Sequence, residues 1–233
     1  MKNFMRIILV FVIFLASVSN ADVALQDNFA TTDMSQAYQH VYQYSIKQKN
    51  FSEPIETLKQ KFLIVINTAN QTLCLYQPNG VLLKSYTIST SKKGVGQLLG
   101  SHKTPIGLHK VVEKIGHNVP HYGIFLNRQF TNKVWQKYFF VNNDPQKKRL
   151  AVHKKDFIVT RILRLQGLEI GTNKGKDHQG KVVDSLYRGI YIHGTTMEWK
   201  LGKPSTIGCI HLSSKDIVEL FNLVPIGCLV LIY

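Results

Sequence analysis

The sequence changes character at residues 62–66, FLIVI, which are followed by the turn 68–70 and by residues 72–76, TLCLY. Both runs are short and rich in β-branched and large apolar residues, which is typical of buried strands. A Pro-Asn-Gly turn at 78–80 then leads into the apolar residues of 81–88. Because each turn joins two such runs, we expect a β-meander to open the folded domain.

Working outward from the meander, the same pattern recurs along the chain. Further strands are predicted at 106–113, 138–141, 157–165, 189–193 and 227–232. The stretches 91–104 and 171–187 are rich in Gly, Lys, Ser and Asp and are expected to be loops. Many short strands predict a mostly β, sandwich-like fold of packed mixed sheets with one or two helices.

One helix of this domain is well marked. It is predicted to begin after Ser213, which can cap its first turn, and to end before Pro225. Ile217, Leu220 and Phe221 would form its buried face. This helix follows Cys209 closely, so we hypothesise that its positive N-terminal end favours a thiolate there.

Three segments divide the chain. Residues 1–21 combine Lys2 and Arg6 with a short apolar run and small residues at the end, the pattern of a cleaved secretory signal. The apolar run is shorter than the roughly 20 residues that span a bilayer, although an uncleaved anchor is the main alternative. Residues 22–60 are expected to be a helical extension or linker, with a helix near 33–49, and residues 61–233 the folded domain. No membrane span is expected after removal of the signal.

The composition indicates a globular and strongly basic protein. The formal net charge is +15, with 44% hydrophobic and 18% charged residues. A positive surplus of this size favours a polyanionic environment, which for an exported protein means the cell envelope; solubility alone is the other interpretation. No arginine-rich stretch is interleaved with aromatic residues, so nucleic-acid binding is not expected.

The chain has three cysteines, an odd number for an oxidising compartment. Cys74 and Cys228 lie in apolar runs and are predicted to be buried in strands, with a disulfide between them left open. Cys209 differs, because glycine and hydroxyl residues precede it. His193 lies 16 positions upstream and could remove the proton of this thiol. On spacing alone, a buried structural cysteine is as well supported as a nucleophile, and a strand-end histidine bound to the backbone is preferred over a base.

The residues around this pair carry a family resemblance. Residues 191–195, YIHGT, together with 202–210, GKPSTIGCI, resemble the catalytic block of the L,D-transpeptidases, the YkuD-type domain. The element 104–107, TPIG, and residues 156–169 are also similar to that family. The resemblance covers about residues 60 to 233. It implies two packed mixed sheets with the active site at one edge.

The resemblance also implies roles for individual residues. Cys209 would be the nucleophile and His193 its base, with the carbonyl of Gly194 orienting the imidazole ring. The amides of Gly208 and Cys209 would stabilise an oxyanion. The expected substrate-binding residues are Gly194, Thr206, Ile207, Gly208 and His211. No cofactor is implied, and no metal site is expected because the histidines lack zinc-ligand spacing.

Two positions depart from the family pattern. Ile207 stands where many members have a second histidine, which weakens substrate positioning more than it weakens the nucleophile. His211 stands where the family has arginine, and a histidine near pH 7 is mostly neutral. A changed substrate preference, a pH-sensitive activity and a weakened enzyme are the three consequences left open.

The resemblance thus implies an exported enzyme of the periplasm or cell envelope that acts on peptidoglycan stem peptides. Its cysteine would form a thioester and transfer it to an amine of a second stem or of an envelope protein. The alternatives are an L,D-carboxypeptidase, in which water accepts the acyl group, and a non-catalytic peptidoglycan-binding homologue. A thiol–disulfide protein is disfavoured because the chain has no Cys-x-x-Cys.

Overall fold

The computed structural model describes residues 61–135 and 156–233. The predicted strand 138–141, the N-terminal helix and the signal segment lie outside these residues. The described strands are β1 (Leu63–Asn67), β2 (Thr72–Tyr76), β3 (Leu82–Thr87), β4 (Gly107–Ile115), β5 (Gly123–Leu126), β6 (Gln129–Val134), β7 (Ile158–Gly167), β8 (Tyr191–Thr195), β9 (Ile210–Leu212) and β10 (Leu229–Ile232). The helices described are η2 (Glu198–Lys200), a 3₁₀ turn, and α4 (Ser214–Leu223).

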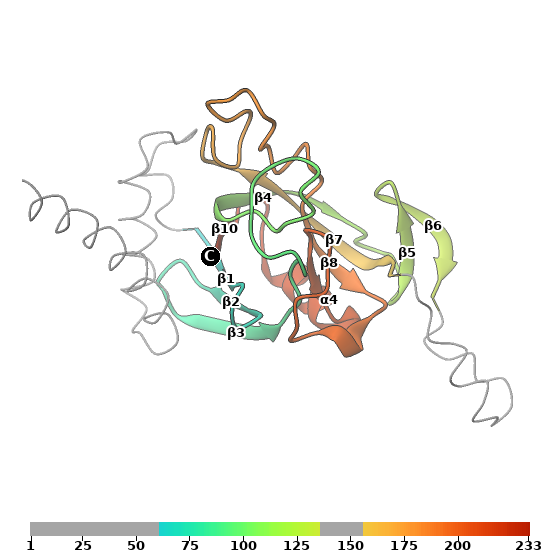
Figure 1. The fold of residues 1–233 in the computed structure, drawn as a ribbon. Helices are drawn as coiled ribbons and strands as arrows, with labels where there is room; N and C mark the ends of the chain where they lie inside the picture. The colour runs from blue at the N-terminus through green and yellow to red at the C-terminus, as the bar shows by residue number, and fades with distance from the viewer. Residues whose placement is uncertain (1–60, 136–155) are drawn as a thin grey trace, which may run out of the picture. The chain divides into compact units, whose positions relative to one another are not determined.

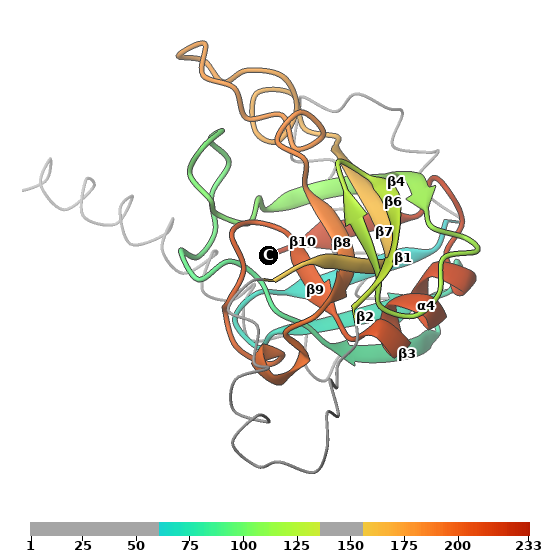
Figure 2. The same cartoon turned by 90° about the vertical axis from the view of Figure 1, so that its right-hand side faces the viewer.

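Hydrogen bonding joins these strands into one mixed sheet in the order β3-β2-β1-β10-β4-β7-β5-β6, with β8 on β7 and β9 on β8 (Figures 1 and 2). The β1–β10 and β8–β9 pairs are parallel, and the remaining pairs are antiparallel. The predicted mostly β class with one or two helices is confirmed. The meander β1–β3 lies where the sequence placed it.

The core is formed where the sheet bends so that distant strands face one another. Buried side chains of β2 and β3 share one apolar cluster with those of β8, β9 and α4. Ile217, Leu220 and Phe221 supply the α4 contribution, as the helical periodicity predicts. Ser213 caps the helix by accepting a hydrogen bond from the Asp216 amide. The two-layer character predicted from the sequence is thus achieved with one bent sheet.

The loops predicted at 91–104 and 171–187 are confirmed, with turns and isolated bridges in place of strands. Residues 171–187, drawn in orange, project from the sheet in Figure 2. The 91–104 loop instead folds toward the turn that precedes β9. A parallel bridge joins Ser91 to Thr206, and the Lys92 amide donates to the Thr206 carbonyl. This contact brings the loop to the neighbourhood of Cys209.

Candidate active site

The parallel pairing of β8 with β9 assembles the site. His193 lies opposite His211 in the register, and their ring centroids are 4.5 Å apart. Cys209 immediately precedes β9, two residues before His211, and the alternation of the strand continued to Cys209 puts its side chain on the same face. Ile192 and Ile210 point to the other face, where they join the core. The three titratable side chains thus share one face of two neighbouring strands.

A bulge in β7 supports this face from the adjoining strand. The register shifts between Val159, opposite Gly194, and Ile162, opposite His193. Thr160 in the bulge has φ +72°, and its hydroxyl bonds the Tyr122 amide at 2.9 Å and the Ser214 hydroxyl at 2.7 Å. Such bulges commonly adjoin functional sites because they redirect the strand.

Gly194 allows β7 to approach closely. A Cβ at this position would lie 2.7 Å from the Val159 carbonyl oxygen, so no larger residue fits without a shift. Gly194 also orients the histidine. Its carbonyl oxygen lies 2.9 Å from Nδ1 of His193, as the resemblance implied. Nδ1 therefore carries the proton, and Nε2 is left to accept another.

The turn before β9 is held by hydroxyl groups. The Thr206 hydroxyl accepts from the Gly208 amide at 3.1 Å and donates to the Cys209 carbonyl at 2.7 Å. The Thr104 hydroxyl, in the 104–107 element, donates to the Gly208 carbonyl at 3.1 Å. Gly208 has φ +131°, and a Cβ there would lie 3.3 Å from the Lys103 carbonyl oxygen. Only glycine suits this turn, which presents Cys209.

These contacts bear on two expectations, the oxyanion role of the Gly208 amide and the substrate-binding role of Thr206. The Gly208 amide is not free to bind an oxyanion in this structure, because it already donates to Thr206. Thr206 is buried and serves the turn. Of the two amides predicted to form an oxyanion hole, the one of Cys209 remains the candidate. Ile207 is 69% exposed, which leaves its side chain available to a substrate.

Cys209 is half-buried, and its sulfur contacts the backbone of the segment that leads into β8. The thiol donates to the Gly189 carbonyl at 3.5 Å. Burial raises the pKa of the Cys209 thiol to about 11, against a backbone hydrogen bond from Tyr191 and the charge of Arg188. Within the described residues, no hydrogen bond joins the sulfur to His193. Nucleophile–base contacts are often long before substrate binds.

The two imidazoles are both neutral at pH 7. Burial lowers the pKa of His193, although the hydrogen bond to Gly194 and the charge of Asp156 oppose the shift. Burial and, next, the neighbouring His193 hold the pKa of His211 well below its usual value. His211 is only 9% exposed, and its Nδ1 lies 3.2 Å from Oδ2 of Asp156. A neutral His211 therefore donates Nδ1–H to this carboxylate.

Asp156 is a site residue that sequence reasoning did not single out, although it begins the stretch 156–169. Its other oxygen accepts from the hydroxyls of Thr195 and Thr196 at 2.6 Å and 3.2 Å. Arg188 was also missed, because it lies between the predicted loop 171–187 and the predicted strand 189–193. Neither role could be found without knowing which loops meet in space.

The helix hypothesis is wrong. The residues of β9 separate Cys209 from α4, and each extended residue carries the chain about 3.3 Å. The helix also packs on the core face, whereas Cys209 lies on the other face. The α4 dipole is therefore not placed at the sulfur.

The other two cysteines are free thiols, so they form no disulfide with each other. Cys228 is fully buried, as predicted. Cys74 is half-buried and lies on the β2 face that alternates with the buried Leu73 and Leu75, so its predicted burial is only partly met.

Residues 61–135 and 156–233 contain no cluster of three or more His, Cys, Asp or Glu side chains that could hold a metal ion. Among the helices within those ranges, none is both long and apolar enough to cross a membrane.

Comparison with known proteins identifies the family. The family model of the L,D-transpeptidase catalytic domain, YkuD, matches residues 61–232. The chain belongs to this family. Among curated protein sequences, none matches this chain.

Solved structures to which the chain is similar include three L,D-transpeptidases. The Mycobacterium smegmatis enzyme is 14% identical, with a TM-score of 0.39 over 74% of this chain and 58% of that one. L,D-transpeptidase 3 of Mycobacterium tuberculosis, in complex with a faropenem-derived adduct, is 16% identical, with a TM-score of 0.40 over 74% and 60%. The Xylanimonas cellulosilytica enzyme is 14% identical, with a TM-score of 0.41 over 75% and 61%. The chain thus spans about three fifths of the length of these structures.

Proposed function

We propose that this L,D-transpeptidase-family domain is a peptidoglycan L,D-transpeptidase in which Cys209 is the nucleophile and His193 the general base. The observation that carries the proposal is the fixed imidazole. Nδ1 of His193 donates a hydrogen bond to the Gly194 carbonyl within β8. This strand pairs with β9, and the turn that presents Cys209 leads into β9. Nε2 of His193 is then the proton acceptor on the face that carries the sulfur.

The first half-reaction is an acyl transfer to sulfur. Sγ of Cys209 attacks the carbonyl carbon that joins the L-centre of a donor stem peptide to its terminal D-residue, and Nε2 of His193 takes the thiol proton. The tetrahedral intermediate collapses as the carbon–nitrogen bond breaks. The imidazolium gives its proton to the leaving amine, and a thioester to Cys209 remains.

The second half-reaction releases the enzyme. An amine of a second stem peptide, or of an envelope protein, attacks the thioester carbonyl and loses a proton to Nε2 of His193. The carbon–sulfur bond breaks, and the returning proton restores the thiol. If water replaces the amine, the same steps give an L,D-carboxypeptidase. Neither half-reaction requires a cofactor.

The pKa shifts of Cys209 and His193 favour transfer of the thiol proton during attack over a thiolate–imidazolium pair formed beforehand. With the pKa of Cys209 raised to about 11 and that of His193 lowered, the resting pair at pH 7 is a thiol and a neutral imidazole. A thiol attacks carbonyls poorly, so the base must remove the proton as the bond forms. Because His193 is already neutral at pH 7, the rate should rise at acidic pH, as the imidazole loses its proton, and level off in the neutral range.

His211 acts in this proposal as a positioning residue. Its ring lies against that of His193, and Asp156 fixes its Nδ1. His211 replaces the family arginine in this proposal. Its buried, neutral ring positions His193 and offers no positive charge to the substrate. Ile207, at the exposed rim, contacts the substrate.

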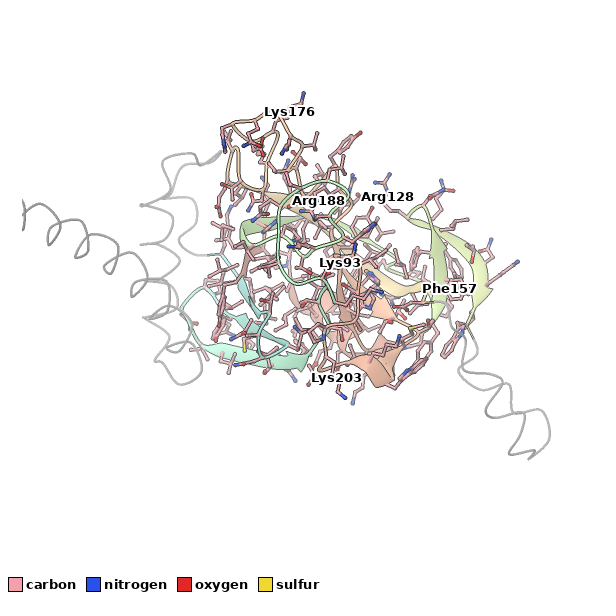
Figure 3. All side chains as sticks on the ribbon, viewed as in Figure 1. Lys93, Arg128, Phe157, Lys176, Arg188 and Lys203 are labelled. Carbon is pink, nitrogen blue, oxygen red and sulfur yellow. The ribbon has the colours of Figure 1, made fainter. Side chains whose placement is uncertain are left out.

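The substrate expected at this site is anionic. Lys92, Lys93 and Lys203 are exposed on the loops that meet beside Thr206, and among the described residues no carboxylate pairs with them. Lys93 and Lys203 are labelled in Figure 3. Stem peptides carry carboxylates, which unpaired lysines attract. Export to the periplasm or cell envelope, directed by residues 1–21, belongs to the same proposal.

The test is intact-mass measurement of the mature protein after incubation with a carbapenem. We expect one covalent adduct, which maps to Cys209 and is absent from Cys209→Ala. Cys74→Ala is the matched control, because Cys74 is also half-buried yet lies on a strand away from the site; it should be acylated like the wild type. Tetrapeptide muropeptides then reveal the acceptor, as cross-linked dimers or as trimmed tripeptides.

An adduct that persists in Cys209→Ala would contradict the assigned nucleophile. Absence of both adduct and muropeptide turnover would leave the non-catalytic binding homologue as the better description. Trimmed tripeptides without dimers would favour the carboxypeptidase.

A further inference from the structure

Arg188 ties a loop to the segment that contacts the nucleophile. Its Nη1 donates to the carbonyl oxygens of Gly96 and Gln97 at 3.2 Å and 2.7 Å, and its Nη2 donates to that of Lys103 at 2.6 Å. All three acceptors belong to the 91–104 loop. The half-buried guanidinium, labelled in Figure 3, thus holds this loop at two separate points, residues 96–97 and Lys103.

Both segments that Arg188 joins, the 91–104 loop and residues 188–189, contact Cys209 or the turn before it. The Lys103 carbonyl lies beside Gly208, and the next residue, Thr104, donates to the Gly208 carbonyl at 3.1 Å. At the other end, Gly189 follows Arg188 in the chain and accepts the Cys209 thiol at 3.5 Å. Arg188 therefore lies between the two segments that hold the nucleophile and its turn.

Among residues 61–135 and 156–233, no carboxylate balances the charge of Arg188. Its three acceptors are neutral carbonyls, and in 61–135 and 156–233 no carboxylate forms an ion pair with it. A half-buried guanidinium without a carboxylate is unusual, because buried charges are normally paired. A negative charge is thus expected nearby at some stage of the reaction.

The thiolate of Cys209 is the anion that fits. Arg188 lowers the pKa of Cys209, and Cys209 in turn raises that of Arg188 against burial. Among the described residues, the other charge that acts on the thiol is that of Asp156, in the opposite sense. His193 and His211, which lie opposite each other on β8 and β9, are largely neutral. Of these groups, Arg188 alone can supply a permanent positive charge.

We propose that Arg188 is a positioning residue for the nucleophile, holding the 91–104 loop beside the Cys209 turn and stabilising the thiolate as it forms. The proposal rests on Cys209 being the nucleophile, as proposed above. Recognition of a substrate carboxylate is the weaker alternative, since both Nη1 hydrogens and one of Nη2 are already used on loop carbonyls.

The test separates charge from hydrogen bonding with two variants. Arg188→Gln keeps amide donors for the loop carbonyls but removes the charge, whereas Arg188→Lys keeps the charge with fewer donors. The readout is the rate of Cys209 alkylation by iodoacetamide between pH 6 and 11, followed by peptide mass spectrometry so that each cysteine is read separately. Arg128→Gln, at an exposed turn of β5–β6, is the matched control.

We expect Arg188→Gln to shift the alkylation profile to higher pH, with the rate at pH 8 falling about tenfold and the difference from wild type narrowing toward pH 11, near the pKa of the thiol. Arg188→Lys should stay within about threefold of wild type at every pH, and Arg128→Gln should not differ. An unshifted profile in Arg188→Gln would overturn the proposal. So would equal slowing of both Arg188 variants at all pH values, since that is the mark of a purely structural tether.

This readout does not depend on transpeptidation. If wild-type protein is not acylated by a carbapenem but Arg188→Gln still shifts the profile, the proposed function fails while the role of Arg188 stands. If acylation occurs and the profile does not move, the reverse holds.

Discussion

The two faces of β8 and β9 differ in what their side chains can explain. On one face, Ile192, Ile210 and Leu212 are completely buried in the core, and removal of apolar surface from water accounts for them. On the other face, His193 and His211 are almost as fully buried although imidazoles are polar. Burying a polar group costs free energy unless its hydrogen bonds are replaced.

The hydrogen bonds found on the polar face offset part of this cost. His193 and His211 each have one ring nitrogen engaged, by Gly194 and by Asp156. The second nitrogen of His193 is the one that proton transfer needs. The difference teaches that one face of this strand pair specifies the fold and the other the chemistry, and substitutions at four positions test that division.

The largest effect is expected for His193→Asn. Asparagine keeps a side chain that can bond the Gly194 carbonyl but removes the base, so carbapenem acylation at pH 7 should fall about a thousandfold. Stopped-flow or quenched-mass kinetics would measure it.

Alkylation of Cys209 above its pKa of about 11 supplies the internal control, because a thiolate needs no base. There His193→Asn should approach the wild-type rate. Slow alkylation at every pH would mean that the substitution disturbed the turn and that the polar face is structural.

Ile210→Ala, one residue beyond the nucleophile, should act only on the fold. Removing this fully buried side chain is expected to lower the free energy of unfolding by about 2–5 kcal/mol. Urea denaturation measures the loss, and Ile210→Val should show about 0.5–1.5 kcal/mol. Acylation per folded molecule should be unchanged. A loss below about 1 kcal/mol would show that the apolar face is less important to the core than its burial indicates.

The apolar face is also the part that sequence predicts best. The strands at 62–66 and 72–76 and the helix after Ser213 were identified because hydrophobic periodicity reports burial directly. The β5–β6 hairpin was missed. Its two-residue turn is Asn127-Arg128, with φ +49° and +67°, and this turn normally signals itself with glycine. The short β9 was missed because it has only three residues.

The polar face could be predicted only in part. Cys209, His193 and the Gly194 carbonyl were found through local motifs and the family resemblance. Asp156 and Arg188 were not found. Asp156 contacts His211, which lies 55 positions away in the sequence. Arg188 bonds backbone carbonyls 85–92 positions away, and these acceptors are neutral. The capture of the Gly208 amide by Thr206 also depends on the conformation of the turn, which residue types alone do not fix.

A third buried imidazole sharpens the contrast. His109 in β4 is completely buried, with Nδ1 bonded to the Gly107 carbonyl and Nε2 to the Ser185 hydroxyl, so both nitrogens are satisfied. Burial lowers the pKa of His109 to about 4. The unfolded chain binds this proton near pH 6.5 and the folded protein does not, so stability is complete above pH 6.5 and is lost as the pH falls toward 4.

The loss attributable to His109 should reach on the order of 3 kcal/mol at pH 4. Urea denaturation at several pH values would measure it, with His109→Gln as the comparison; the variant should lose less stability between pH 6.5 and 4. Its acylation should match the wild type at pH 7, because His109 serves the fold. Parallel pH profiles for the two proteins would contradict the assigned role.

The smallest effect is expected for Ile207→Ala, three residues before Ile210. Since Ile207 is 69% exposed, the free energy of unfolding should change by less than about 0.5 kcal/mol. If its side chain contacts substrate, KM for a muropeptide donor should rise a few-fold while kcat stays within about twofold, because binding is lost equally in the ground and transition states. A matching fall in kcat would instead place Ile207 in contact with the reacting groups. With either result, isoleucine would serve the core at position 210 and the active site at position 207. Exposure of the side chain, and not the residue type, would distinguish the two roles.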